Sequence, residues 1–375
     1  MVSSMSFNNN LRAFIRNSIG WTTNRKIIII ESDDWGAIRM PSTHAFDAIL
    51  KKGLDSSGYS LRYNQYDTLA NKDDLSLLFE VLSTFRDVND NCPIITALTI
   101  VANPDFNKIR DSEFNEYHYE PFTKTLERYY GSDTPFPLWL EGIQNKIFLP
   151  QFHGREHLNV AVWMKALKMN DVDARFAFDQ GLWGFNNSHP FGISYLAAFD
   201  LEHQKQLPFQ VEIIKDGLRL FKQLFGYSAS YFVPPNGPFN NQLESVAASE
   251  GIRFIFAEKI QNEPIGEGRM KKRYHYPGQL NQHGQYYISR NCFFEPSELG
   301  KDWVDSCMND INSAFRCHKP AVISSHRVNY IGALDVTNRS NGLQQLRLLL
   351  DRALKIWPDV EFLSSVDLGE LMGQS

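Results

Sequence analysis

The chain has 375 residues, an apolar share of 43% and a formal net charge of −5. This charge excludes a strongly basic nucleic-acid-binding surface, and no stretch of about 18 apolar residues predicts a membrane span. The first residues contain no apolar segment typical of a signal peptide, so we expect a cytoplasmic protein. The four cysteines lack paired spacing, which favours reduced thiols over disulfides or a thiolate zinc site.

The segment Lys26–Trp35, KIIIIESDDW, is the clearest strand in the chain. Its four consecutive isoleucines predict a strand that is buried on both faces of a parallel sheet. Glu31, Asp33 and Asp34 follow, and carboxylates are costly to bury unless they bind something. Because functional groups in α/β folds gather at the carboxyl ends of strands, we place Asp33 and Asp34 in an active site. No downstream feature requires Glu31.

The rest of the chain alternates between predicted helices and predicted strands. Helices are expected at 43–53, 71–85, 208–225, 243–250, 303–316 and 343–356, and strands at 93–101, 146–151, 174–179, 231–235, 253–257, 321–325 and 360–363. The stretch 54–70 is expected to be a long loop, and 103–145 an aromatic-rich excursion. This alternation favours a (β/α) barrel over separate domains.

His153 and His157 follow the strand predicted at 146–151. A spacing of four residues places both imidazoles on one face of a helix, where they can bind one metal ion. Considered alone, such a pair could equally be structural. Together with an acid pair at another strand end it favours a metal centre, in which one carboxylate and two imidazoles leave positions open for water and substrate.

His326 ends another apolar strand, AVISSH, and would bring a group that titrates near neutral pH to the same rim. A hydrogen-bonded core histidine is the alternative. The segment Tyr231–Asn240, YFVPPNGPFN, has two prolines that fix a turn after a strand, and Gly237 permits close approach of the backbone. A simple strand-ending turn would also explain it.

Taken in order, these segments resemble the motifs of the polysaccharide deacetylase family, the NodB-homology domain of carbohydrate esterase family four. The matching segments are ESDDW at 31–35 (similar to TFDDG, with the glycine one place later at Gly36), the H-x-x-x-H pair His153 and His157, FVPP at 232–235 (similar to F-R-P-P), Asp302-Trp303, and the strand that ends at His326. The resemblance runs from Lys26 to Met372, almost the whole chain.

This resemblance implies a deformed (β/α)7 barrel of the TIM-like, α/β class that removes N- or O-acetyl groups from a carbohydrate, whether a sugar, a sugar nucleotide or an oligosaccharide. A single barrel would span 26–372 after an N-terminal extension at 1–25. Its insertions would lie near 37–70, 103–145 and 181–207.

The resemblance also implies roles for the matching residues. Asp34, His153 and His157 would hold a divalent metal, most often zinc. Asp33 would be the general base that takes a proton from water activated by the metal, and His326 the general acid that protonates the leaving group. The candidate substrate contacts are Trp35, Pro235, Asn236 and Arg327, and Asp302 is the candidate residue for orienting His326.

The sequence departs from the family at Val233, where the family has an arginine that orders the base. Arg39, Arg155 or Arg327 could replace it. Without a replacement Asp33 would be poorly held, so a barrel that binds carbohydrate without turning it over is an alternative. Aromatic residues in 103–145 could stack on sugar rings or pack the inserted segments together.

Two other enzyme classes share part of the pattern. HGREH at 153–157 matches H-x-x-E-H, a metalloprotease signature in which Glu156 would be the base. That signature lies within a helix, however, whereas an apolar strand leads into this one, and the two aspartates would be unexplained. A glycosidase that uses two carboxylates would leave the histidine pair without a role.

Overall fold

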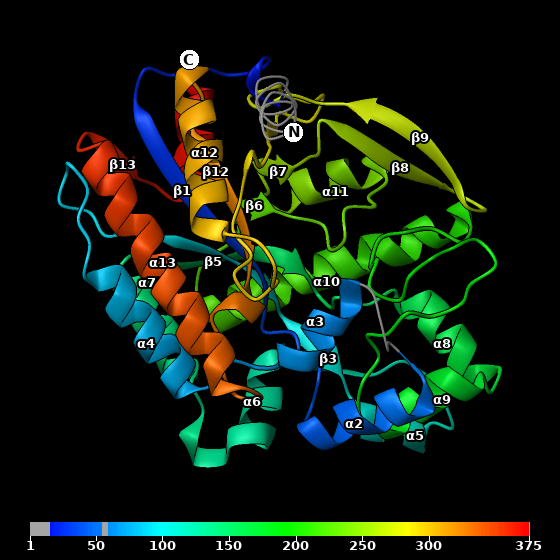
Figure 1. The fold of residues 1–375 in the computed structure, drawn as a ribbon. Coiled ribbons are helices and arrows are strands. Elements are labelled where there is room, and N and C mark those ends of the chain that lie inside the picture. The colour runs from blue at the N-terminus through cyan, green and yellow to red at the C-terminus, as the bar shows by residue number, and fades with distance from the viewer. Residues whose placement is uncertain (1–15, 55–58, 375) are drawn as a thin grey trace, which may run out of the picture.

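The computed structural model describes residues 16–54 and 59–374, and is built around one parallel β-sheet (Figure 1). The strands of this sheet are β1 (Lys26–Trp35), β2 (Ile95–Ile100), β5 (Phe148–Gly154), β6 (Tyr231–Phe232), β7 (Phe254–Phe256), β10 (Tyr286–Ile288), β11 (Cys292–Phe293), β12 (Ala321–His326) and β13 (Val360–Phe362). Their order is β10-β7-β6-β5-β2-β1-β12-β11, with β13 beside the beginning of β1. The predicted α/β class and the deformed parallel barrel are confirmed.

Strand β1 lies at the centre of the sheet. Ile27 and Ile29 pack into one apolar cluster, while Ile28 and Ile30 pack into a second, larger cluster on the opposite face. The strand is therefore buried on both faces, as its isoleucine run predicts. Its neighbour β12 runs parallel to it in unbroken register, from Ile28 opposite Ala321 to Asp33 opposite His326.

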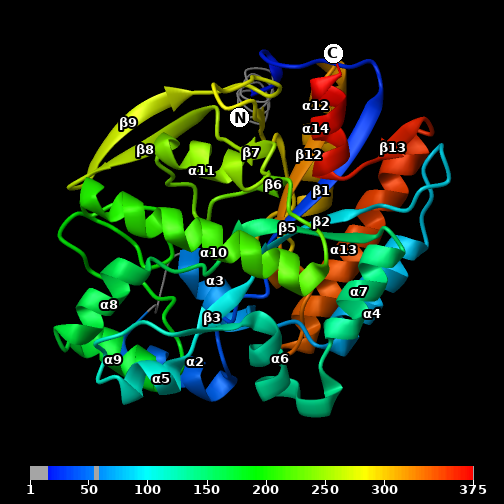
Figure 2. The ribbon, with the colours of Figure 1, turned by 180° about the vertical axis from the view of Figure 1, so that it is seen from behind.

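Helices cover the outside of the curled sheet, and Figure 2 shows α10 crossing the back of the strands. The helices are α2 (Thr43–Lys52), α3 (Tyr59–Tyr66), α4 (Lys72–Ser83), α5 (Phe106–Asp111), α6 (Phe122–Tyr130), α7 (Phe136–Gln144), α8 (Val160–Lys168), α9 (Val172–Asp179), α10 (Leu207–Phe225), α11 (Glu244–Ser249), α12 (Trp303–Arg316), α13 (Val336–Ile356) and α14 (Ser365–Gly373). No helix among the described residues has the length and apolar character needed to cross a bilayer.

Local capping explains where several helices begin and end. Ser42 caps the start of α2 through its side chain, and Gly53 ends the helix with a left-handed φ of 83°. Asn71 begins α4 with a capping box, and Gly226 ends α10 in the left-handed conformation. These are the boundaries that the sequence predicts.

Two predicted elements are wrong. The stretch 174–179 is not a strand but the end of α9, which the side chain of Asp171 caps by accepting the N–H of Ala174. Its buried residues, Ala174, Ala177 and Phe178, have the i, i+3, i+4 spacing of a helix. The predicted loop at 54–70 contains α3, although 55–58 lie outside the described residues.

Two small antiparallel sheets complete the fold: β3 (Ala102–Pro104) pairs with β4 (Tyr119–Pro121), and β8 (Ile260–Gly266) forms a hairpin with β9 (Arg269–Tyr274). The β8–β9 hairpin extends along one side of the molecule (Figure 1). The division into an extension at 1–25 and a barrel at 26–372 stays a prediction, and 1–15 lie outside the described residues.

The two end strands of the sheet, β10 and β11, do not pair with each other in the described part of the chain. Only residues 289–291 connect them, so this short link spans the open seam of the barrel. Arg290 is the central residue of the link, and its side chain reaches back to β1.

Candidate metal centre and catalytic cavity

Asp33 and Asp34 are adjacent, but their side chains have different partners. Asp34 has a φ of 74°, an uncommon conformation for a residue other than glycine, and the pairing of β1 with β2 shifts register between Ser32 and Trp35. As a result, Asp33 pairs with Arg290 while Asp34 faces two histidines. Backbone strain of this kind is common at functional sites.

The four-residue spacing of His153 and His157 predicts a shared helical face, but the structure does not place them on one helix. His153 lies on β5, and His157 lies in the loop that leads from β5 to α8. Between them Gly154 has a φ of 139°, and a Cβ at this position would lie 3.1 Å from the carbonyl oxygen of Glu156 and 3.3 Å from Cγ of Pro235. The loop folds back tightly here, which brings the second imidazole beside the first.

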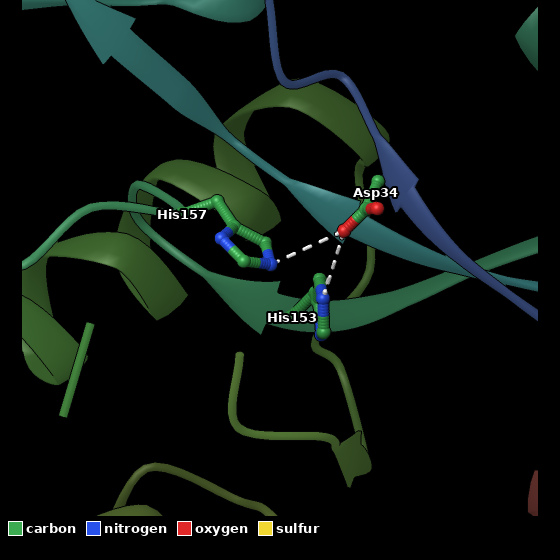
Figure 3. Close-up of side chains that lie close together, drawn as sticks. All are labelled: Asp34, His153 and His157. Atoms are coloured by element: carbon green, nitrogen blue, oxygen red, sulfur yellow. Dashed lines mark ion pairs between the residues drawn. The ribbon is translucent and has the colours of Figure 1, made fainter. Parts of the chain in front are cut away.

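Both imidazoles point their Nε2 atoms at the same carboxylate oxygen (Figure 3). Asp34 Oδ1 lies 3.5 Å from His153 Nε2 and 3.2 Å from His157 Nε2. The three potential ligand atoms lie within 4.8 Å of one another, and all three residues are buried.

The chemistry of this set fits a divalent cation. His153 Nδ1 lies 2.7 Å from the carbonyl oxygen of Val233, so Nδ1–H donates to that oxygen and leaves the Nε2 lone pair free. Burial raises the pKa of Asp34, but the closeness of the His157 and His153 imidazoles outweighs this effect and holds that pKa well below its usual range. One ionised carboxylate and two imidazoles are ligands that zinc accepts, with positions left open.

Arg290 makes the contact with Asp33 that the motif resemblance would expect from an arginine at position 233. Its guanidinium forms two hydrogen bonds with the carboxylate of Asp33, of 2.6 and 2.7 Å. Its Nε donates to Glu31 at 2.5 Å, and Glu31 is fully buried and also accepts from Ser365. The prediction that nothing requires Glu31 is wrong, because this carboxylate fixes the orientation of Arg290.

None of the three arginines predicted to replace the family arginine contacts Asp33. Arg155 pairs with Glu156 and Asp216, Arg327 pairs with Asp67, and Arg39 donates to the side-chain oxygen of Asn64. Burial raises the pKa of Asp33, but the charge and hydrogen bonds of Arg290, together with the neighbouring imidazoles, lower it by more. The carboxylate is therefore ionised and available to accept a proton.

His326 lies on the other side of Asp33, with 3.8 Å between its Nε2 and Oδ2 of Asp33. Its Nδ1 lies 2.5 Å from Oε1 of Glu295, whose other oxygen accepts from Arg62 and Asn329. Burial lowers the pKa of His326, but the charge and hydrogen bond of Glu295 raise it to about 9. The imidazole is therefore protonated near neutral pH.

In the structure Glu295, and not Asp302, makes the contact that orients His326. Asp302 is the N-cap of α12 and accepts the backbone N–H of Asp305. Its position just before a helix explains its side chain fully. The predicted orienting role of Asp302 is therefore wrong.

One cavity of about 610 Å³ opens on all of these groups. Its lining includes Asp33, Asp34, His153, His157, Arg290 and His326, together with Arg39, Tyr63, Asn236 and Glu258. A second cavity of about 310 Å³ shares Asn236, Phe256 and Glu258 with the first and continues toward Met270 of the β8–β9 hairpin. The reactive groups thus lie at one end of a longer depression.

Of the four predicted substrate contacts, Asn236 lines this cavity and the other three do not. Trp35 is fully buried, where its ring packs edge-on against Phe148. Arg327 is also fully buried and donates to Asp67 and the backbone of Ala37. Pro235 is buried beside Gly154. These three residues belong to the packed interior around the cavity and do not line it.

The aromatic residues of 103–145 pack among themselves and against the core. Phe122 and Trp139 lie 4.9 Å apart between ring centroids, and no residue of this stretch lines the large cavity. Glu156 also lies outside the cavity lining, where its carboxylate accepts from Arg155 at 2.6 Å. The base that a metalloprotease would need is therefore not available to a substrate.

Comparison with solved structures finds matches over nearly the full chain. They include a protein assigned as a polysaccharide deacetylase from Mycobacterium smegmatis (10% identity, TM-score 0.45, covering 95% of this chain and 93% of that one) and a pseudoenzyme of the CE4 family from Bacillus anthracis (8%, 0.37, 92% and 66%). A 4-alpha-glucanotransferase from Thermococcus litoralis also matches (9%, 0.46, 92% and 40%). No family model and no curated protein matches by sequence. At these identities and scores the activity has to be argued from the site itself.

Arg290 and Glu295 are the functional residues that sequence reasoning missed. Both follow very short strands, β10 of three residues and β11 of two, whose apolar runs are too brief to stand out. A usable signal exists in YYISRNCFFEP, where each apolar run is followed within two residues by a charged side chain. The same rule identified Asp33 and His326.

Proposed function

We propose that this chain is a zinc-dependent deacetylase that hydrolyses N- or O-acetyl groups on a carbohydrate. The observation that carries the proposal is the content of one cavity. A buried Asp-His-His donor set, an ionised aspartate held by an arginine, and a protonated histidine held by a glutamate all face the same space. These are the parts that metal-assisted amide or ester hydrolysis needs.

The charge state of each residue fits its proposed role. A zinc ion held by Asp34, His153 and His157 would polarise the acetyl carbonyl and make water more acidic. Asp33 accepts the proton of the attacking water, because Arg290 and the nearby imidazoles keep its carboxylate ionised. The bidentate contact with Arg290 also restricts rotation of the carboxylate, which lines the same cavity as the donor set.

His326 supplies the opposite function. Its imidazolium donates a proton from Nε2 to the departing amine or alkoxide, while Glu295 holds Nδ1. Because Glu295 raises the pKa of His326 to about 9, the proton donor is loaded at neutral pH. One cavity therefore holds an ionised base and a protonated acid at the same time, with 3.8 Å between their closest atoms.

The carbohydrate assignment rests on the motif resemblance and is supported by the form of the site. The cavity is large enough for more than one sugar ring. Its outer wall carries small polar side chains, Asn186, Ser194 and Asn236, which can exchange hydrogen bonds with hydroxyl groups.

The binding-only alternative was motivated by the missing arginine, and Arg290 supplies that group from the link between β10 and β11. A direct test is acetate release. The purified protein would be stripped of metal, reloaded with Zn²⁺, and assayed with N- and O-acetylated sugars, alongside Asp33→Asn and Glu156→Gln variants. Zinc-dependent release that is lost in Asp33→Asn and kept in Glu156→Gln supports the deacetylase. Stoichiometric zinc without turnover on any acetylated sugar would support the binding barrel instead.

A further inference from the structure

Arg39 is the buried charge in the cavity that the proposed reaction does not use. It lines the cavity and is only 7% exposed. Its Nε donates to the side-chain oxygen of Asn64 at 3.0 Å, and its guanidinium lies over the ring of Tyr63, with Cζ 5.0 Å from the centroid. Neither contact is an ion pair, and Asp67, whose carboxyl is influenced by the charge of Arg39, forms its own ion pair with Arg327.

The other deeply buried arginines behave differently. Four described arginines are more than nine-tenths buried, and three of them have a carboxylate partner. Those pairs are Arg155 with Glu156, Arg327 with Asp67, and Arg339 with Asp74. Arg39 has no carboxylate within ion-pair distance among the described residues. Because a buried charge is costly unless it is paired, this exception indicates that its partner arrives with the ligand.

The position of Arg39 relative to the proton donor sets the size of that ligand. The ring of Tyr63 contacts both side chains: its centroid is 5.4 Å from that of His326 and 5.0 Å from Cζ of Arg39. The guanidinium and the imidazole therefore share Tyr63 as a direct neighbour near the reacting end of the cavity. This spacing suits a charged group on the same sugar as the acetyl group, or on the sugar directly attached to it.

The charges of the cavity lining agree with an anionic ligand. Asp33 is matched by Arg290, and Asp34 belongs to the metal donor set. Of the other cations, Arg16 is paired with Asp310, which leaves Arg39 and Lys259, whereas Glu258 is the remaining carboxylate. Glu258 lies where the large cavity meets the second one, on the side of Gly237, and lines both. A divalent cation would add further positive charge.

We propose that Arg39 binds an anionic group of the substrate, so that the sugar that is deacetylated carries a carboxylate or a phosphate close to its acetyl group. The statement that this sugar is deacetylated rests on the proposed function, but the anion site can be tested without turnover. A guanidinium forms bidentate hydrogen bonds with either anion, which gives both charge recognition and orientation.

The binding test uses the zinc-loaded protein and sugars without acetyl groups. Calorimetry would compare glucose, glucuronic acid and glucose 1-phosphate with the natural chain, Arg39→Gln, Arg39→Lys and Arg219→Gln. Arg219 is exposed on α10 and lies outside the cavity, so it is a matched control for general loss of positive charge. We expect at least one anionic sugar to bind tenfold or more tightly than glucose. This preference should disappear in Arg39→Gln, weaken in Arg39→Lys and stay in Arg219→Gln.

The possible outcomes separate the two proposals. Equal binding of charged and neutral sugars by the natural chain overturns the anion site, even if the Arg39→Gln protein does not fold. An anion preference that survives in Arg39→Gln also overturns it, because the zinc ion alone would then be the receptor. A preference for the carboxylate over the phosphate, or the reverse, identifies the kind of sugar. If the protein releases acetate from neutral acetylated sugars and shows no preference for charged ones, the deacetylase proposal is supported and the anion site is contradicted.

A kinetic test follows where turnover is found. N-acetylglucosamine would be compared with its 6-carboxylate and its 1-phosphate. We expect Arg39→Gln to lower kcat/KM for the anionic substrate at least tenfold more than for the neutral one, mainly through KM, because Arg39 contacts no reacting atom. An equal loss for both substrates would contradict charge recognition.

Discussion

Arg290 and Asp33 are separated by 257 positions in the chain, yet two parallel hydrogen bonds join their side chains at 2.6 and 2.7 Å. The arginine comes from the link that spans the open seam of the barrel, between β10 and β11. An arginine therefore contacts Asp33, the proposed base, while Val233 belongs to the same buried apolar cluster as Ile27 and Ile29. In the proposed mechanism Arg290 has the role that the motif resemblance would give to an arginine at position 233.

Replacing Arg290 by Met should lower kcat by about a hundredfold or more, because Asp33 would lose the contact that holds its carboxylate as a base. The zinc content should not change, since Arg290 contacts no member of the donor set. The free energy of unfolding should fall by about 3–5 kcal/mol, because Glu31 would be left buried without its cation. Acetate-release kinetics, metal analysis and chemical denaturation measure the three effects.

A double variant separates positioning from stability. Glu31→Gln with Arg290→Met removes the buried unpaired charge and should recover part of the lost stability, but none of the lost kcat. If the double variant regained activity together with stability, Arg290 would have only a structural role.

Removing one member of the donor set should abolish stoichiometric zinc binding. We expect His157→Ala to lower zinc affinity by a hundredfold or more, since a three-residue set has no spare ligand. Glu156→Gln changes the neighbouring residue, which lies outside the cavity lining, and should retain zinc. Plasma emission spectroscopy on dialysed protein compares the two. Equal zinc content in His157→Ala and the natural chain would contradict the assigned donor set.

The alkaline limb of the pH profile should report His326. This residue acts in its protonated form, and its pKa is raised to about 9, so activity is present below that pH and falls as the pH rises through it. A cation at the donor set repels the imidazolium, so the limb of the loaded enzyme lies somewhat lower. In Glu295→Gln the limb should move toward the ordinary histidine value of about 6.5, which is a loss of up to about thirtyfold near pH 8. If the alkaline limb of the pH profile is unchanged in Glu295→Gln, Glu295 does not position His326.

Gly154→Ala tests the backbone turn between the two histidines. Its φ of 139° is unfavourable for a side chain, and the new Cβ would press on the Glu156 carbonyl. We expect a loss of about 1–3 kcal/mol of stability and weaker zinc binding, because the turn sets the spacing of the imidazoles. Gly53→Ala is the control: this glycine also has a positive φ, but nothing lies within 4 Å of the new Cβ. It should cost about 1 kcal/mol and leave zinc binding unchanged.

The features that could be predicted from the sequence are those that a single segment encodes. The isoleucine run predicts β1, and the cap residues Ser42 and Asn71 predict the starts of α2 and α4. The donor set could also be predicted, because Asp34, His153 and His157 all follow apolar runs and strand ends meet at one rim of a parallel sheet.

What could not be predicted depends on contacts between distant segments. The partners of Asp33 and His326 are fixed by how β10 and β11 dock, and strands of three and two residues give almost no periodic signal. The four-residue spacing of the histidines suggested a helix, because the unusual backbone of Gly154 is not visible in the sequence. Likewise the short apolar and aromatic run at 174–179 suits a strand as well as a helix, and in the structure it belongs to α9.

The register of β1 and β12 has a consequence for how this catalytic pair can change. Asp33 and His326 are opposite residues on adjacent parallel strands, so their backbones are held about 4.8 Å apart by the ladder itself. Loop motion and loop replacement leave that spacing almost untouched. Altered activity in variants of this barrel is therefore expected to come from the segments that carry Arg290, Glu295 and Arg39, while the proposed proton acceptor and proton donor keep their spacing.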